Sequence, residues 1–366
     1  MAFVPHPLPP EPPLQLSGVD QDLLERANRA IGRLDGLSVL PPDTSLFIYF
    51  YVRKEAVLSS QIEGKQSSLS DLLLYESDHA TPVPLDDVEE VSNYVAAMSL
   101  GVKLIREGFP LSLRLLREIH GVLLSRGRGA EKNPGELRST QNWIGGSRPS
   151  NAIFVPPPPT HVPDCMSALE KFMNDVPVRT PTLIKAALAH VQFETIHPFL
   201  DGNGRLGRLL VTLLLCAERA LVEPVLYLSL FFKKNRQSYY DLLQRVRTEG
   251  DWESWLRFFL EGVLQTSDQA VDAARRTVQM FEQHRRTLER YKRSAASALR
   301  LQEAMQRKPV LSIGGAAQLT GLTVPTVTAA LEKMGNEGLV EEVTGRRRDR
   351  VFVYTPYVRL LSEGAD

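Results

Sequence analysis

Apolar residues recur along most of this chain at intervals of three and four positions, the spacing of amphipathic α-helices. In the stretch 22–34, one face carries Leu23, Ala27, Ala30, Ile31 and Leu34. Asp43 or Thr44 can cap a second helix. Its apolar positions include Leu46, Phe50, Val57 and Leu58. The same period predicts further helices at 86–107, 112–125, 165–174, 182–193, 204–219, 236–248, 252–265 and 268–306. The pattern therefore predicts a mainly α-helical protein.

One short segment departs from this pattern. Apolar residues at 143–144 and 153–155 flank the turn-rich stretch 145–151, which predicts a β-hairpin. The prolines at 156–159 end it, because proline offers no backbone donor. At the start of the chain, the prolines between residues 5 and 13 predict an extended and poorly ordered arm.

The C-terminal end has a different organisation. After a charged, solvated connecting helix, stretches 312–319 and 324–334 predict two short helices joined by a tight turn, and 339–354 predicts two strands. Helix, turn, helix and wing in this order predict a small winged-helix domain beyond a boundary near residue 308. Its wing is crowded by Arg346, Arg347, Arg348 and Arg350, which favours DNA phosphates as a partner. The nearby Glu332, Glu337, Glu341 and Glu342 favour protein contact or dimerisation instead, and both alternatives stay open.

Composition narrows the class of protein. The 366 residues allow one large core and a smaller module, and the net charge of zero demands no polyanionic partner. The two cysteines are too few for a disulfide framework, and Cys216 reads as a buried free thiol of a core helix. With no apolar run of membrane-spanning length and no signal-peptide pattern, we expect a cytoplasmic protein that contacts no membrane.

The strongest candidate for chemistry is the segment HPFLDGNGRLGR at residues 197–208. His197 precedes a proline and is therefore presented from a loop. The run Gly202, Asn203, Gly204 leads into an apolar helix, and backbone N–H groups at a helix N-terminus bind anions.

Arg205 and Arg208 lie three positions apart in the first turn of that helix, where cations oppose the helix dipole at a cost of about 0.3–1 kcal/mol each. A bound polyphosphate makes this arrangement favourable, because the guanidiniums then bind its negative charge. Asp201 would then be a magnesium ligand and His197 a general base. The chain has no Walker-type loop, and its histidines lack the spacing of a zinc site.

This segment matches the full signature of the Fic-domain family, which it therefore resembles. The resemblance implies an all-α domain that transfers AMP from ATP-Mg²⁺ to Ser, Thr or Tyr hydroxyls of proteins, itself included. It implies His197 as the base and Asp201 as the Mg²⁺ ligand. It also implies that the phosphates are held by Gly202, Asn203, Gly204, Arg205 and, at the γ-phosphate, Arg208. The hairpin would be the flap that holds the unidentified protein target as an added strand. Gly204 stands where phosphate-transferring relatives have lysine, which favours AMP.

A second pattern, Ser59-x-x-x-Glu63-Gly64, resembles the inhibitory helix of the same family. Glu63 would pair with Arg208 and occupy the guanidinium that the γ-phosphate needs. In some relatives the same glutamate supports the reverse reaction, hydrolytic removal of AMP. The alternative interpretation is a plain helix C-terminus closed by Gly64.

The resemblance implies an adenine site after the motif helix, at Asn235 and Tyr240. Tyr239 and Tyr240 are adjacent and face about 100° apart on a helix, so one of them belongs to the core. His120, His161 and His190 are interpreted as structural.

The expected organisation has five parts: an arm and first helix at 1–40, a helical region with the inhibitory helix at 41–110, a catalytic core at 111–265 with its flap at 140–156, connecting helices at 266–308 and the winged helix at 309–366. A homodimer is a possible assembly. The alternative function is a nucleotide-sensing transcriptional regulator or antitoxin-like partner that acts through the winged helix.

Overall fold

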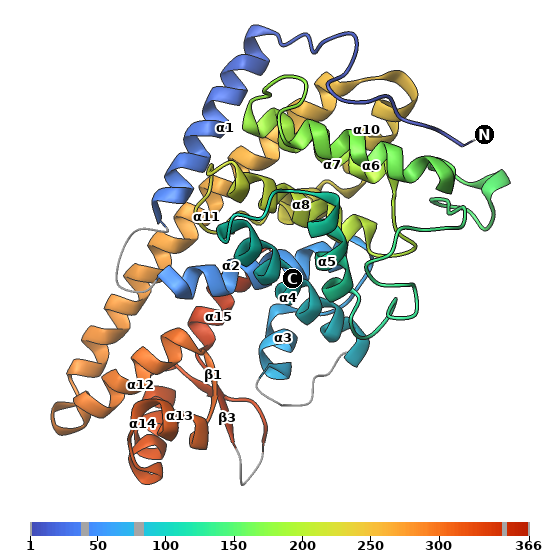
Figure 1. Cartoon of the computed structure of the whole chain (residues 1–366). Coiled ribbons are helices and arrows are strands. Elements are labelled where there is room, and N and C mark those ends of the chain that lie inside the picture. The colour runs from blue at the N-terminus through green and yellow to red at the C-terminus, as the bar shows by residue number, and fades with distance from the viewer. Residues whose placement is uncertain (1, 38–43, 77–83, 346–349, 365–366) are drawn as a thin grey trace.

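The computed structural model describes residues 2–37, 44–76, 84–345 and 350–364. The described chain is mainly helical, as the sequence predicts (Figure 1). The helices of its larger part are α1 (Gly18–Leu37), α2 (Thr44–Ile62), α3 (Leu69–Tyr75), α4 (Leu85–Arg106), α5 (Leu113–Leu123), α6 (Val162–Met173), α7 (Thr182–Ile196), α8 (Asn203–Ala217), α9 (Ser229–Lys234), α10 (Arg236–Glu249) and α11 (Trp252–Glu289). The C-terminal part holds α12 (Ala295–Arg307), α13 (Ile313–Thr320), α14 (Val324–Asn336) and α15 (Thr355–Ser362), with the strands β1 (Val310–Ser312), β2 (Glu341–Glu342) and β3 (Val351–Val353). None of the described helices is long and apolar enough to cross a membrane.

The centre of the larger part is the pair α7 and α8. Every residue of α7 after Thr182 is buried, because α6, α8, α10 and α11 surround it. The apolar side of α8 packs on α4 and α5 as well as on α7. The loop between α7 and α8, residues 197–202, is therefore held at both ends by the core.

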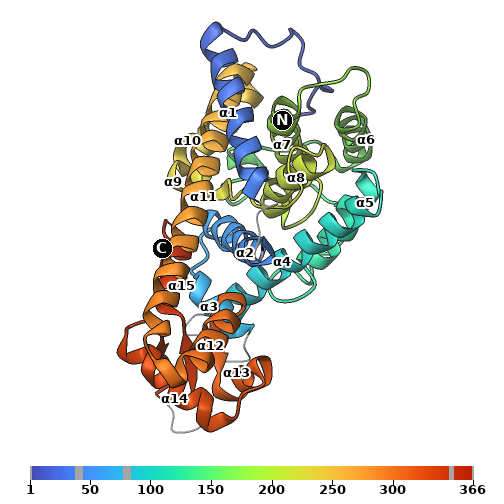
Figure 2. The same ribbon diagram turned by 90° about the vertical axis from the view of Figure 1, so that its left-hand side faces the viewer.

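The long helix α11 differs from the sequence prediction. A break was expected at residues 266–267, but the helix continues through them to Glu289. Thr266 and Ser267 are buried, and the Thr266 hydroxyl donates to the carbonyl of Gly262 one turn earlier, so this side chain bonds within the helix instead of ending it. In both views α11 runs along the whole molecule, with α1 beside it and the C-terminal part at its far end (Figures 1 and 2).

The C-terminal part contains the expected helix, turn and helix, and its three strands form an antiparallel sheet of order β1-β3-β2. Val353 of β3 pairs with both Val310 and Glu341. The strand β1 and the helix α15 were not predicted from the sequence. Three of the expected wing arginines, at 346–348, lie outside the described residues.

Helix α2 joins the two parts. The core of the C-terminal part includes Phe50 of α2 and Leu69 and Leu73 of α3. The ring of Tyr357 in α15 meets Phe50 edge to face, with 5.0 Å between centroids. The other half of α2, including Val57, is packed in the larger core.

The expected hairpin at 140–156 is reduced to one antiparallel bridge between Ile144 and Phe154. Its tip is closed by the Asn151 side chain, whose Oδ1 accepts from the backbone of Ser147 and Arg148. These bonds give the tip a compact turn instead of longer strands.

The N-terminal arm is extended, as expected, but it is packed rather than poorly ordered. Its Phe3 N–H donates to the carbonyl of Val155 at 2.9 Å, and Leu8 is buried. The Gln192 side chain donates to the carbonyl of His6 at 2.7 Å. Both cysteines are free, and Cys216 is partly rather than fully buried.

Candidate functional site

The loop between α7 and α8 has two left-handed residues. His197 ends α7 with φ 49° and ψ 59°, and Gly202 precedes α8 with φ 75°. Glycine adopts this conformation freely, whereas it costs another residue about 1–2 kcal/mol. The Asn203 side chain closes the loop, since its Oδ1 accepts from the Phe199 N–H and its Nδ2 donates to the Phe199 carbonyl. The loop thus holds His197 in one conformation at the N-terminus of α8.

A cavity of about 250 Å³ opens at this helix terminus. The motif contributes most of one wall: His197, Leu200, Asp201, Gly202, Asn203, Gly204 and Arg208. The other walls come from α2, the hairpin, α7 and α10, through Glu63, Ile144, Glu194, Tyr239, Tyr240, Leu243 and Arg247. The start of a helix and a guanidinium on one wall make a site for an anion.

The pairing of Glu63 with Arg208 expected from the sequence is present. The Arg208 Nη2 lies 2.6 Å from Glu63 Oε1, and its Nε donates to the Ser59 hydroxyl at 2.8 Å. Gly204 leaves room for this contact, because a Cβ there would lie 2.7 Å from Glu63 Oε1. Gly64 follows α2 with φ 90°, so the helix also ends as a glycine-closed C-terminus.

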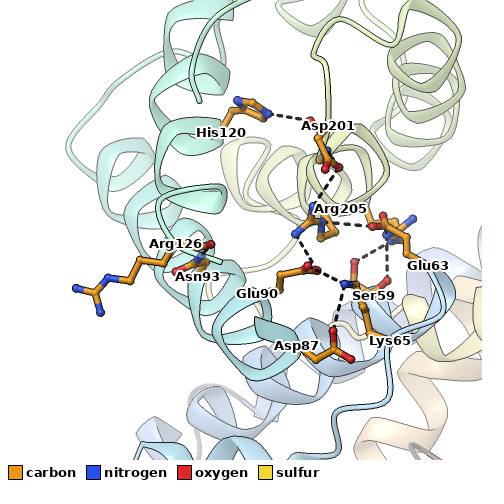
Figure 3. Close-up of polar contacts among 12 residues, drawn as sticks. Ser59, Glu63, Lys65, Asp87, Glu90, Asn93, His120, Arg126, Asp201 and Arg205 are labelled. Atoms are coloured by element: carbon orange, nitrogen blue, oxygen red, sulfur yellow. Dashed lines mark hydrogen bonds and ion pairs between the residues drawn. The ribbon is translucent and has the colours of Figure 1, made fainter. Parts of the chain in front are cut away.

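Arg205 does not line the cavity, and its expected contact with phosphates stays a prediction. Its buried guanidinium is surrounded by three carboxylates: Glu90 at 3.2 Å, Asp201 at 3.4 Å and Glu63 at 3.4 Å (Figure 3). Glu90 also lies 2.8 Å from the Lys65 ammonium. Arg205 shares the Glu63 carboxylate with Arg208, and through Asp201 it also holds the loop before α8.

His197 is suited to accept a proton. Burial lowers the pKa of its imidazole to about 3, and the cations Arg247 and Arg138 act in the same direction, against the Glu194 carbonyl and the Asp201 carboxylate. The ring is therefore neutral at neutral pH and lines the cavity. A neutral imidazole can accept a proton, and an anion bound beside it would raise its pKa toward the operating pH that a general base needs.

Asp201 fits the role of a magnesium ligand. Its carboxylate lines the cavity, is partly exposed and accepts the Gly202 N–H at 2.6 Å. Within the described residues, no three His, Cys, Asp or Glu side chains gather as a metal cage. A Mg²⁺ ion commonly uses one or two carboxylates together with phosphate and water oxygens, and one carboxylate at a phosphate site meets this need.

Two of the three histidines interpreted as structural, His120 and His190, hold elements together, whereas His161 is exposed. The Gly135 N–H donates to His120 Nδ1, so His120 Nε2 carries the proton and donates to the Asp201 carbonyl at 3.0 Å. His190 Nδ1 faces the Gly207 carbonyl, so its Nε2 accepts from the Tyr239 hydroxyl at 2.9 Å. Burial lowers the pKa of both rings to about 4, which keeps them neutral.

The far end of the cavity only partly matches the expected adenine site. Tyr240 is 40% exposed and lines the cavity, while Tyr239 is the core member of the pair, though its edge also reaches the wall. Asn235 does not line the cavity, and its amide donates to the Phe231 carbonyl. Arg247 was missed, although the spacing 239, 243, 247 on α10 could have indicated it.

Comparisons with known proteins agree with this geometry. A family model described as "Fic/DOC family N-terminal" matches residues 21–103, and one described as "Fic/DOC family" matches residues 110–215, which together span more than half of the chain. The chain belongs to the Fic/DOC family. It is 35% identical over 216 residues to a protein adenylyltransferase Fic of Culex quinquefasciatus (57% of this chain, 39% of that one). It is 31% identical over 259 residues to a protein adenylyltransferase Fic of Aedes aegypti (68% and 48%). This Fic chain spans less than half the length of these two relatives.

Solved Fic structures share the fold. A Fic family protein from Desulfovibrio desulfuricans G20 superposes with a TM-score of 0.62 at 21% identity, covering 94% of this chain and 98% of that one. A Fic domain containing signaling protein from Bacteroides thetaiotaomicron VPI-5482 gives 0.55 at 20% identity, covering 68% and 97%. At these identities the likeness concerns the fold.

A buried carboxyl, Glu55, lies behind the Fic site. It stands one turn before Ser59 on α2 and accepts from the hydroxyl and the N–H of Ser229 in α9. Burial raises the pKa of Glu55 to about 7, although the Ser229 bonds and Arg208 oppose the shift. Because the folded-state pKa lies above the unfolded one, the group favours the native state below about pH 4.5, and this contribution is lost as pH rises through 7.

Glu55→Gln is therefore expected to gain stability relative to the wild type as pH rises. Between pH 5 and pH 8, the unfolding free energy of the variant should rise by about 2–3 kcal/mol relative to that of the wild type. Chemical denaturation of both proteins at the two pH values measures it. The exposed Glu107, replaced in the same way, should give no such trend. A pH-independent difference for Glu55→Gln would show that the carboxyl stays ionised.

Proposed function

We propose that this Fic protein is a protein adenylyltransferase that moves AMP from ATP-Mg²⁺ to Ser, Thr or Tyr hydroxyls of proteins, and that Glu63 restrains it. The observation that carries the proposal is the neutral His197 on one cavity wall with the α8 N-terminus, Asp201 and Arg208. Relatives that cover part of this chain bear the name protein adenylyltransferase Fic, which supports the same activity.

Different residues have different roles in the proposed reaction. Residues 202–204 bind the phosphates at the start of α8 through the backbone N–H groups of Asn203 and Gly204, and Arg208 neutralises their terminal charge. Asp201 would hold Mg²⁺, which supplies further charge neutralisation when bound. His197 takes the proton of the target hydroxyl. The hydroxyl oxygen bonds to the α-phosphorus, the bond from that phosphorus to the β-phosphate oxygen breaks, and pyrophosphate leaves.

Glu63 restrains this reaction by charge competition. Its carboxylate occupies the Arg208 guanidinium at 2.6 Å, where the γ-phosphate would otherwise bind. ATP then enters without its terminal charge contact and is misaligned for transfer. Glu63 also lines the cavity, so removal of AMP by water is a second reaction that the same carboxylate would support.

Position-specific labelling tests the proposal. The protein is incubated with ATP labelled at the α-phosphate or at the γ-phosphate, and modified peptides are mapped. AMP transfer carries over only the α label and adds one AMP to a hydroxyl side chain. Transfer of the γ label would instead show phosphate transfer. No label at all in the wild type and in Glu63→Gly would leave the nucleotide-sensing function as the better explanation.

The C-terminal part completes the proposal. We propose that residues 309–366 form a winged helix-turn-helix joined to the Fic core at 111–265 by the helices at 266–308. The sharp turn at Gly321, with φ 67°, and the Thr323 hydroxyl that caps α14 support a helix-turn-helix. DNA or a second protein would be its partner, and a homodimer its assembly.

A further inference from the structure

A buried arginine joins the hairpin to the catalytic loop. Arg138 is only 3% exposed and lies just before the hairpin. Its Nε donates to the carbonyl of His197 at 2.9 Å, and its Nη2 to the carbonyls of Pro157 at 2.5 Å and Ile196 at 3.4 Å. Its Nη1 donates to the carbonyl of Thr140 at 3.3 Å. One side chain thus contacts both ends of the hairpin and both residues at the end of α7.

The partners of Arg138 are all carbonyl oxygens. Among the described residues, no Asp or Glu forms an ion pair with this guanidinium. A buried cation with only neutral partners is costly unless its donors are well directed. The planar fork of arginine can direct several N–H groups at once, whereas a lysine ammonium offers three donors from one point. The arrangement of these carbonyl groups therefore fits the planar guanidinium of arginine, and a positive charge alone would not replace it.

The bond to His197 falls on a strained residue. His197 adopts the left-handed conformation without being glycine, and such residues persist only where their surroundings fix them. The Arg138 Nε bond to the His197 carbonyl is one such constraint, and the Arg138 N–H donates to the carbonyl of the next residue, Pro198, at 3.0 Å. Asn142, inside the hairpin, adds a longer bond to the His197 carbonyl at 3.4 Å.

We propose that Arg138 is a positioning residue that locks the His197 backbone and holds the hairpin in register with it. The inference rests on the proposed function: a hydroxyl presented along the hairpin and the imidazole that takes its proton would then share one rigid frame. Arg138 is not part of the cavity wall, so it acts on the base and not on the nucleotide.

The test compares self-modification rates in a Glu63→Gly parent of full length, with Arg138→Met and Arg138→Lys added separately. For Arg138→Met we expect the maximal rate to fall by about a hundredfold, the usual effect of a base displaced by an ångström. The ATP concentration at half-maximal rate should change by less than about threefold, since the phosphate wall is untouched. Arg138→Lys should lie between the parent and Arg138→Met.

Arg117→Met is the matched control. Arg117 is a partly exposed arginine of the preceding helix that also donates to a backbone carbonyl, that of Gly135. Its loss should leave the maximal rate within about twofold of the parent. Asn142→Ala removes the weaker bond to His197 together with a bond to the Phe199 carbonyl at 3.1 Å, and should lower the rate less than Arg138→Met does.

The outcomes separate the positioning role of Arg138 from the proposed AMP transfer. Transfer by the parent together with an unchanged maximal rate in folded Arg138→Met overturns the inference alone. An equal loss of ATP affinity overturns it too, because the side chain would then support the whole site. If circular dichroism shows that Arg138→Met does not fold, Arg138→Lys and Asn142→Ala are used in its place. The same comparison applies to them: a lower maximal rate with an unchanged ATP concentration at half-maximal rate supports the inference. A parent that transfers no AMP overturns the proposed function, and the inference with it.

Discussion

Glu63→Gly is expected to raise the rate of AMP transfer by about ten- to a hundredfold. A hydrogen bond between charged groups is worth about 1.5–3 kcal/mol, and the variant frees the Arg208 guanidinium from its 2.6 Å contact for the γ-phosphate. The measurement is the initial rate of self-modification with ATP-Mg²⁺, followed as the mass increase of the intact protein.

Two further variants sharpen this prediction. Glu63→Gln keeps the shape of the side chain but removes its charge, so its rate should lie between the wild type and Glu63→Gly. Glu107→Gly removes an exposed glutamate remote from the cavity and should leave the rate unchanged. Equal rates for the wild type and Glu63→Gly would mean that the ion pair does not restrain transfer.

His197→Ala in the Glu63→Gly protein is expected to lower the transfer rate by about 10²–10⁴-fold, the usual contribution of a positioned general base. ATP affinity should be retained, because the 202–204 backbone and Arg208 still bind the phosphates. His197→Asn should behave alike, since asparagine tolerates the left-handed conformation at this position but is no base. Transfer rates and calorimetric ATP binding are measured on the same samples.

His161→Ala is the control for this pair, because His161 is an exposed histidine outside the cavity. It should transfer AMP at the rate of the parent. A His197→Ala rate within tenfold of the parent would show that another group takes the proton.

The sequence predicted what depends on local spacing. Glycines at 202 and 204 and a proline at 198 predict a loop that opens a helix, and the structure contains it. The Glu63 contact with Arg208 joins residues 145 positions apart, and only the family resemblance indicated it. Arg205 shows the limit of local reasoning. Its spacing from Arg208 suggested one shared phosphate face, but the Arg205 guanidinium is also bonded to Glu90, 115 positions earlier, which no local pattern indicated.

Helices were predictable where their length let a period of 3.6 residues accumulate. Helices α3, α9 and α15 have eight residues or fewer and were not predicted, whereas α13, also eight residues long, was predicted beside its tight turn. The hairpin was predicted as two strands, yet the bonds of Asn151 leave one bridge. The role of Arg138 could not be inferred in advance, since carbonyl partners leave no mark in a sequence.

The sharing of α2 between two cores bears on how the protein can be divided. Phe50, Leu69 and Leu73 are each 2% exposed or less, under cover of the C-terminal part. A fragment ending near residue 308 would bare these side chains to water, and with them the helix that carries Glu63. Shortened versions of the chain would then confound loss of the C-terminal part with a disturbed restraint. Point substitutions in the intact chain are therefore the better way to assign a function to each part.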